Sequence, residues 1–149
     1  MTASKRPGRR TVKSVAPAAA RDARRRRLLA LLREIDQAWV QAFRESGFSD
    51  IYFSRLFTEL WLRGDTAIAK TDAYNLVKEV GTQTAIKYVR RAVQEGYLEE
   101  VDNPLDGRSR LLRMTPRLTE RFAAVIDSID NSLTTLFGPE QAAARRTLG

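Results

Sequence analysis

Amide, hydroxyl and cationic side chains gather on one side of residues 82–95 when that segment is projected as a helix. The side carries Gln83, Thr84, Lys87, Arg91 and Gln94, with Tyr88 and Arg90 at its margins. The opposite side carries only small or branched apolar residues, namely Ala85, Val89, Ala92 and Val93. Amide and hydroxyl groups can hydrogen-bond base edges, and Lys and Arg can contact phosphates. The same composition is also typical of an ordinary solvated helix face.

A hairpin with basic side chains follows this segment. Residues 97–101 and 110–114 have the pattern of two short strands, and Pro, Asn and Asp-Gly between them predict a tight connection. Arg108 falls near its tip, and Arg110 begins the returning strand. We expect at least one arginine of that strand to face solvent or a phosphate.

The remaining elements are predicted from apolar periodicity. Helices are expected over residues 22–46, 50–63, 71–80 and 82–95, with Thr71 and Thr82 as N-caps, a small strand over 66–69, and a long helix from Pro116 to about Phe137. A helix, a turn, a second helix and a hairpin are the order of a winged helix-turn-helix, in which one helix enters the major groove of DNA. The predicted fold is therefore mainly α with a small β-hairpin wing, flanked by long N- and C-terminal dimerisation helices.

Composition excludes several classes of enzyme. The 149 residues contain no His and no Cys, so the chain has no Ser-His-Asp triad, thiol nucleophile, disulfide or Cys/His zinc site. No paired-carboxylate, P-loop or metal-ligand pattern stands out either. We expect a binding protein without a metal or cofactor.

The net charge of +8 lies in the N-terminal arm. Residues 1–27 hold ten basic residues and one acid, whereas the other 122 residues hold 16 basic and 17 acidic residues. Residues 1–20 have no periodic apolar pattern and are predicted to be disordered, ahead of one domain over 21–149. Neither an export signal nor a membrane span is expected. An Arg-rich organelle transit peptide is an alternative interpretation of the arm. The expected location of the protein is the cytoplasm, in association with the nucleoid.

The segment EGYLEEVDNPLDGRSRLLRMTPRLTERF, from Glu95, resembles the wing of MarR-type transcription regulators. In that family a Gly-Leu pair leads through an Asp-x-x-Asp-x-Arg loop into a strand and a Leu-Thr helix start. The matching residues are Gly96, Leu98, Asp102, Pro104, Asp106, Arg108, Leu112, Met114 and Thr115. Thr84 aligns with the family's recognition-helix Thr, and Lys87 falls where an Arg is usual. The close resemblance covers residues 77–122, and the helix order fits across 22–137.

The resemblance implies a recognition helix at about 82–95 and a wing at about 97–114. It implies that Arg108 enters the minor groove and that Asp106 braces the wing through an ion pair. The alternative for Arg108 is an ordinary exposed arginine in a turn. The alternative for Asp106 is that it only stabilises the turn before Gly107. The predicted DNA-binding residues are Gln83, Thr84, Lys87, Tyr88, Arg90, Arg91, Arg108 and Arg110. The family also implies a two-fold dimer through the terminal helices, which is the favoured interpretation of their apolar stripes; intradomain core is the alternative.

Two further sets of residues have a functional and a structural interpretation. Trp39, Phe43, Phe57 and Trp61 could line a pocket for a small aromatic effector, although aromatic residues at helical spacing are more often core. Arg24, Arg25, Arg26 and Arg27 circle the helix axis and suit diffuse phosphate contact, or belong to a solubilising tail.

The sequence thus predicts a homodimeric, sequence-specific regulator of transcription that binds double-stranded DNA and no membrane. One alternative is a winged-helix adaptor that binds proteins through the same surface, which the nearly neutral body favours. Another is a nucleoid or membrane-surface protein that binds mainly through its Arg-rich arm.

Overall fold

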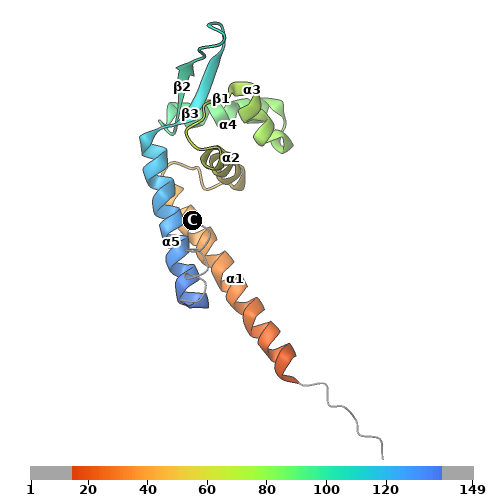
Figure 1. Ribbon diagram of the computed structural model, residues 1–149. Coiled ribbons are helices and arrows are strands. Elements are labelled where there is room, and N and C mark those ends of the chain that lie inside the picture. The colour runs from red at the N-terminus through yellow and green to blue at the C-terminus, as the bar shows by residue number, and fades with distance from the viewer. Residues whose placement is uncertain (1–14, 139–149) are drawn as a thin grey trace, which may run out of the picture.

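Two long helices and a small winged unit make up the protein. The computed structural model describes residues 15–138 (Figure 1). Its elements are α1 (Val15–Phe43), α2 (Ile51–Leu62), β1 (Ile68–Ala69), α3 (Lys70–Leu76), the 3-10 turn η1 (Lys78–Val80), α4 (Thr82–Gln94), β2 (Leu98–Asp102), β3 (Arg110–Met114) and α5 (Pro116–Phe137). Helices α1 and α5 pack side by side, and the other elements gather at one end of this pair (Figure 1). The predicted fold class is confirmed.

Helix α1 begins earlier than the sequence predicts. Residues 15–20 are helical, so the predicted disorder over 1–20 is wrong for these residues, while residues 1–14 lie outside the described part of the chain. Alanine and arginine are among the strongest helix formers, and they dominate the segment that begins at Ala18. A pair between Arg25 Nη1 and Asp22 Oδ1 at 3.0 Å adds a contact one turn apart.

The sheet has three antiparallel strands in the order β1-β3-β2. Strands β2 and β3 form the predicted hairpin, with Leu98 opposite Met114 and Asp102 opposite Arg110. The short β1 adds to the other edge of β3, where Ile68 lies opposite Leu112. Because β1 runs directly into α3, the sheet and the helix-turn-helix form one unit.

The two predicted threonine N-caps are wrong. The N-cap of α3 is Ala69 and that of α4 is Gly81, and neither helix has a side-chain cap. Strand β1 leads straight into α3, which leaves Thr71 inside the helix. Gly81 has a φ of 86°, a conformation that glycine adopts at little cost, and it redirects the chain from η1 into α4.

Helix α5 starts as the sequence predicts. Thr115 is its N-cap and accepts a hydrogen bond from the backbone N–H of Leu118, and Pro116 follows in the first turn. The Thr115 hydroxyl also donates to the carbonyl oxygen of Gly96 at 2.6 Å. This residue therefore joins the long helix to the base of the wing.

An aromatic core holds the winged unit against the two long helices. Phe43 of α1, Phe57 of α2 and Tyr97 at the base of the wing are completely buried. The Phe43 ring lies 5.7 Å from each of the other two. These contacts fix the base of the wing and α2 against the C-terminal end of α1. Among the described helices, none is long and apolar enough to cross a bilayer.

Candidate nucleic-acid interface

Part of the polar face of α4 is exposed and carries side chains that are unpaired within residues 15–138. Ala85, Val89 and Ala92 are buried against the core. The opposite face exposes Gln83, Thr84, Lys87 and Arg90. Within residues 15–138, none of these four side chains forms a hydrogen bond or ion pair. They are available to an external partner, as the sequence predicts.

Tyr88 faces inward instead. Its hydroxyl donates to Asp50 Oδ2 at 2.7 Å, and its ring lies 4.3 Å from the ring of Phe53. Burial, reinforced by the hydrogen bond to Asp50, raises the pKa of Tyr88 to about 12. Asp50 also caps α2 by accepting from the backbone N–H of Tyr52 at 2.7 Å. The Tyr88 hydroxyl is therefore used to join α4 to the start of α2.

Arg91 is likewise committed to the fold. Its Nη2 donates to the carbonyl oxygen of Ser46 at 2.9 Å, and its guanidinium lies 4.8 Å from the centre of the Phe48 ring. A Cβ added at Gly47 would lie 2.5 Å from the same Nη2, so this glycine makes room for the side chain. Arg91 fastens α4 to the loop between α1 and α2, and no signal in its own helix reveals this.

We expect Arg91→Met to lower the free energy of unfolding by about 1 to 2 kcal/mol, because the variant lacks both a charge-assisted hydrogen bond and a cation–π interaction. Arg90→Met is the matched control, since the Arg90 side chain is exposed and unpaired within the part of the chain that the structure describes. Urea unfolding of both variants measures the difference. Equal stabilities would contradict the structural role of Arg91.

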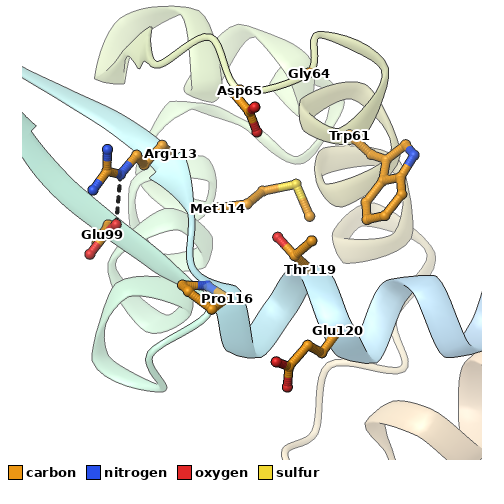
Figure 2. A pocket seen from close by; sticks show the side chains of 9 residues that line it. All are labelled: Trp61, Gly64, Asp65, Glu99, Arg113, Met114, Pro116, Thr119 and Glu120. Carbon is orange, nitrogen blue, oxygen red and sulfur yellow. Dashed lines mark hydrogen bonds and ion pairs between the residues drawn. The ribbon is translucent and has the colours of Figure 1, made fainter.

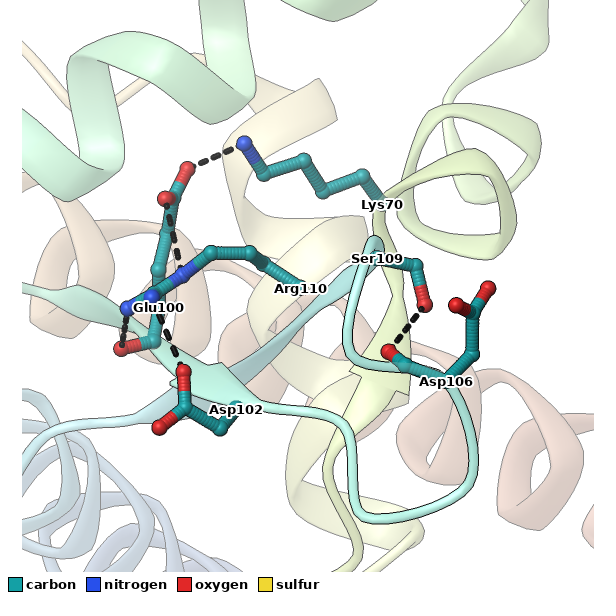
Figure 3. Close-up of polar contacts among 6 residues, drawn as sticks. All are labelled: Lys70, Glu100, Asp102, Asp106, Ser109 and Arg110. Carbon is teal, nitrogen blue, oxygen red and sulfur yellow. Dashed lines mark hydrogen bonds and ion pairs between the residues drawn. The ribbon is translucent and has the colours of Figure 1, made fainter.

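Arg110 lies in a charged network at the end of the hairpin strands, next to the wing loop (Figure 3). Its Nη1 contacts Asp102 Oδ1 at 3.0 Å, and its Nη2 donates to the carbonyl oxygen of Glu100 at 3.2 Å. The Glu100 carboxylate also pairs with Lys70 of α3 and lies 3.6 Å from Arg110 Nε. The hydrogen bond from Lys70, more than the nearby Arg110, lowers the pKa of Glu100 against the opposing effect of burial. Arg110 thus stiffens the wing and is not a free cation.

Lowering the pH should weaken this network. The pKa of Glu100 is below its ordinary value of 4.5 in the folded protein, so its stabilising contribution is complete above that value and disappears as pH falls through the folded pKa. We expect Glu100→Gln to be less stable than the wild type at neutral pH and to lose less stability in acid. Urea titrations at pH values on both sides of 4.5 test this. Parallel losses in the two proteins would contradict it.

The wing tip exposes Arg108 without a side-chain partner among the described residues. The predicted ion pair of Asp106 is wrong, because no described residue forms one with it. Its carboxylate instead accepts from the backbone N–H of Arg108 at 3.0 Å, and its carbonyl accepts from the N–H of Ser109. Asp106 therefore braces the wing by folding back on its own turn. Leu105 at this tip was not among the predicted site residues, and its side chain is 95% exposed.

The four arginines of the arm lie far from the winged unit. Arg24, Arg25, Arg26 and Arg27 are exposed near the N-terminal end of α1, opposite the end where α4 and the wing lie (Figure 1). The guanidinium carbons of Arg24 and Arg27 lie 6.0 and 5.8 Å from the centre of the Phe137 ring at the end of α5. The fold thus separates two basic surfaces, the arginines of α1 and the surface of α4 and the wing, along the length of the molecule.

The predicted aromatic pocket is not formed. Phe43 and Phe57 are fully buried and Trp39 is 8% exposed, since these rings pack on one another in the core. Trp61 lines a cleft of about 840 Å³ between the end of α2, the base of the wing and the start of α5 (Figure 2), and Trp39 lines a separate, smaller cleft of about 330 Å³ between α1, α2 and α5. The larger cleft is also lined by Gly64, Asp65, Glu99, Arg113, Met114, Pro116, Thr119 and Glu120. Arg113 and Glu99 neutralise each other at 2.6 Å.

Comparisons with known proteins identify the fold. No protein-family model matches the sequence, and no curated protein matches it. The structure is similar to a transcriptional regulator from Thermotoga maritima, with a TM-score of 0.60 and 20% identity over 83% of this chain and 87% of that chain. It is also similar to wild-type MarR from E. coli in its apo form, with a TM-score of 0.51 and 17% identity over 83% and 91% of the two chains.

A mutant E. coli MarR in complex with operator DNA gives a TM-score of 0.50 at 15% identity, over 83% of this chain and 88% of that one. At these identities the similarity shows the fold. The winged-helix fold that MarR-type regulators have is therefore the fold of this chain, as the wing motif predicts.

Proposed function

We propose that this protein regulates transcription by binding double-stranded DNA as a homodimer. The observation that carries the proposal is the free polar face of α4, with Lys87 and Arg90 unpaired on it, beside a wing whose tip exposes Arg108. A helix of this kind fits the major groove, and the wing reaches the adjacent backbone or minor groove. The similar E. coli MarR structure with operator DNA supports this use of the fold.

The unpaired side chains support a smaller set of direct DNA contacts than the sequence alone predicts. In this proposal Gln83 and Thr84, at the start of α4, would contact base edges, while Lys87 and Arg90 would contact phosphates or bases. Tyr88, Arg91 and Arg110 act on DNA only indirectly, because their polar groups hold α4 and the wing in position. Arg108 is the expected minor-groove residue.

The homodimer is proposed from apolar side chains that the single chain leaves exposed. Leu28, Leu29, Leu32 and Val40 of α1 and Ile126 of α5 are between 43 and 65% exposed. A row of this kind along two long helices is typical of an interface. A second copy related by a two-fold axis would cover it and place two α4 helices against one operator.

A regulator that binds DNA in this way would act in the cytoplasm, where it has access to the nucleoid.

Selection of bound duplexes from a random DNA pool tests the proposal. We expect an enriched motif with two inverted half-sites, separated by about one helical turn. The Lys87→Ala variant serves as the control and should enrich the motif poorly. A pool that remains random after selection by the wild type would contradict sequence-specific binding. A retained protein partner, insensitive to nuclease, would then favour the adaptor.

A further inference from the structure

A cluster of arginines encircles α1 at the end away from the winged unit. This basic collar consists of Arg21, Arg24, Arg25, Arg26 and Arg27, all of which are exposed. Asp22 is the one acid in that stretch, and it pairs with Arg25 at 3.0 Å. The chain from residue 28 onward contains 16 basic and 17 acidic residues. The collar is thus the strongest concentration of positive charge in the described chain.

The collar is too far from α4 to strengthen binding to the same stretch of DNA. At about 1.5 Å per residue, α1 carries Phe43 roughly 27 Å from Arg25, and the winged unit lies beyond Phe43 (Figure 1). Electrostatic attraction between exposed charges decays over about 8 Å at physiological salt. A duplex held by α4 and the wing therefore gains little from the collar of the same chain.

The arrangement of the collar favours a polyanion over a membrane. Four consecutive arginines lie about 100° apart around the helix, so they do not leave an apolar face on this segment. A helix that lies on a membrane needs such a face. Contacts with Phe137 hold Arg24 and Arg27 against α5, which gives the collar a defined place in the fold. Evenly distributed guanidinium groups match the regular phosphates of a duplex without reading its bases.

We propose that the collar binds the phosphate backbone of a second DNA duplex, so that the protein bridges two duplexes. The inference rests on the proposed function, since the first duplex occupies α4 and the wing. The homodimer would present two collars on the side away from the operator, each able to contact phosphates. The protein would then organise DNA as well as recognise an operator.

A two-duplex capture assay tests this inference. The full-length protein is bound to an immobilised duplex that carries the selected motif, and a labelled duplex of unrelated sequence is added. The wild type should retain the labelled duplex. Arg25→Gln combined with Arg26→Gln should reduce this retention by about tenfold. The slope of log affinity against log salt should become shallower by about 0.9 for each phosphate that the variant no longer neutralises.

Arg33→Gln combined with Arg44→Gln is the matched control, because it removes the same charge from two exposed positions outside the collar, one in α1 and one in the turn that follows it. The control and the collar variant should both bind the immobilised duplex as the wild type does. A wild type that binds the first duplex and captures no second one would overturn the bridge but not the proposed function. Failure to bind the first duplex would overturn both. Collar-dependent flotation with anionic phospholipid vesicles, without capture of DNA, would assign the collar to membranes instead.

Discussion

Replacing Lys87 and Arg108 together by alanine is expected to lower affinity for the selected operator by about a hundredfold or more. Each cation contributes about 1 to 3 kcal/mol where it contacts a base or phosphate, and about 1.4 kcal/mol corresponds to tenfold in affinity. Both side chains are exposed and have no partner among residues 15–138, so their removal should leave stability unchanged. Fluorescence anisotropy at fixed salt and thermal unfolding measure the two quantities.

The matched control for this variant is Arg33→Ala with Arg44→Ala, which removes one exposed cation of α1 and one of the turn after it. It should retain nearly full affinity, because both residues lie outside the winged unit. Undiminished affinity of the Lys87 and Arg108 variant would show that α4 and the wing do not contact the operator. Equal losses in the two variants would show a dependence on net charge alone.

Replacing Leu29 and Leu32 together by glutamate should convert the protein to a monomer and abolish operator binding at concentrations where the wild type is saturated. These side chains are 65 and 52% exposed on the single chain, and a two-fold interface would bury four of them. Burial of a leucine contributes about 1.5 to 3 kcal/mol, and buried carboxylates without partners would oppose association further. Sedimentation velocity measures the mass of the particle.

Leu62→Glu is the control, because this side chain is 74% exposed on α2 in the winged unit, apart from the row of apolar side chains along α1 and α5. It should leave the dimer intact. Circular dichroism should show the same helix content in both variants, since the substituted positions are on the surface. A wild type that sediments as a monomer, or a Leu29 and Leu32 variant that stays dimeric, would contradict the proposed interface.

Local signals predicted the order and type of the elements well. The recognition helix, predicted at 82–95, spans Thr82–Gln94, and the hairpin and the Pro116 helix start are where the sequence places them. Apolar periodicity, turn residues and a proline in the first helical turn all act within a few residues of chain. The early start of α1 was missed because its segment lacks apolar periodicity, even though its alanines and arginines favour a helix.

The roles of the cationic side chains could not be predicted in the same way. Lys87 and Arg91 lie on the same predicted helix face, yet only Lys87 is free, because the loop after α1 supplies the Ser46 carbonyl to Arg91. Similarly, Glu100 and Asp102 of the neighbouring strand occupy Arg110, whereas Arg108 at the tip has no such neighbour within the described chain. A helical projection shows the side chains of one helix only. It therefore cannot show a hydrogen-bond or ion-pair partner that another element supplies.

By itself, the sequence determined the element order, the nearly neutral body, the wing motif and the absence of His and Cys chemistry, since each follows from residue identity and local spacing. Only the tertiary structure decided which polar groups are free for a partner, and that the collar of arginines lies at the opposite end from α4. The physical reason is that hydrogen bonds and ion pairs between distant segments depend on how the helices pack.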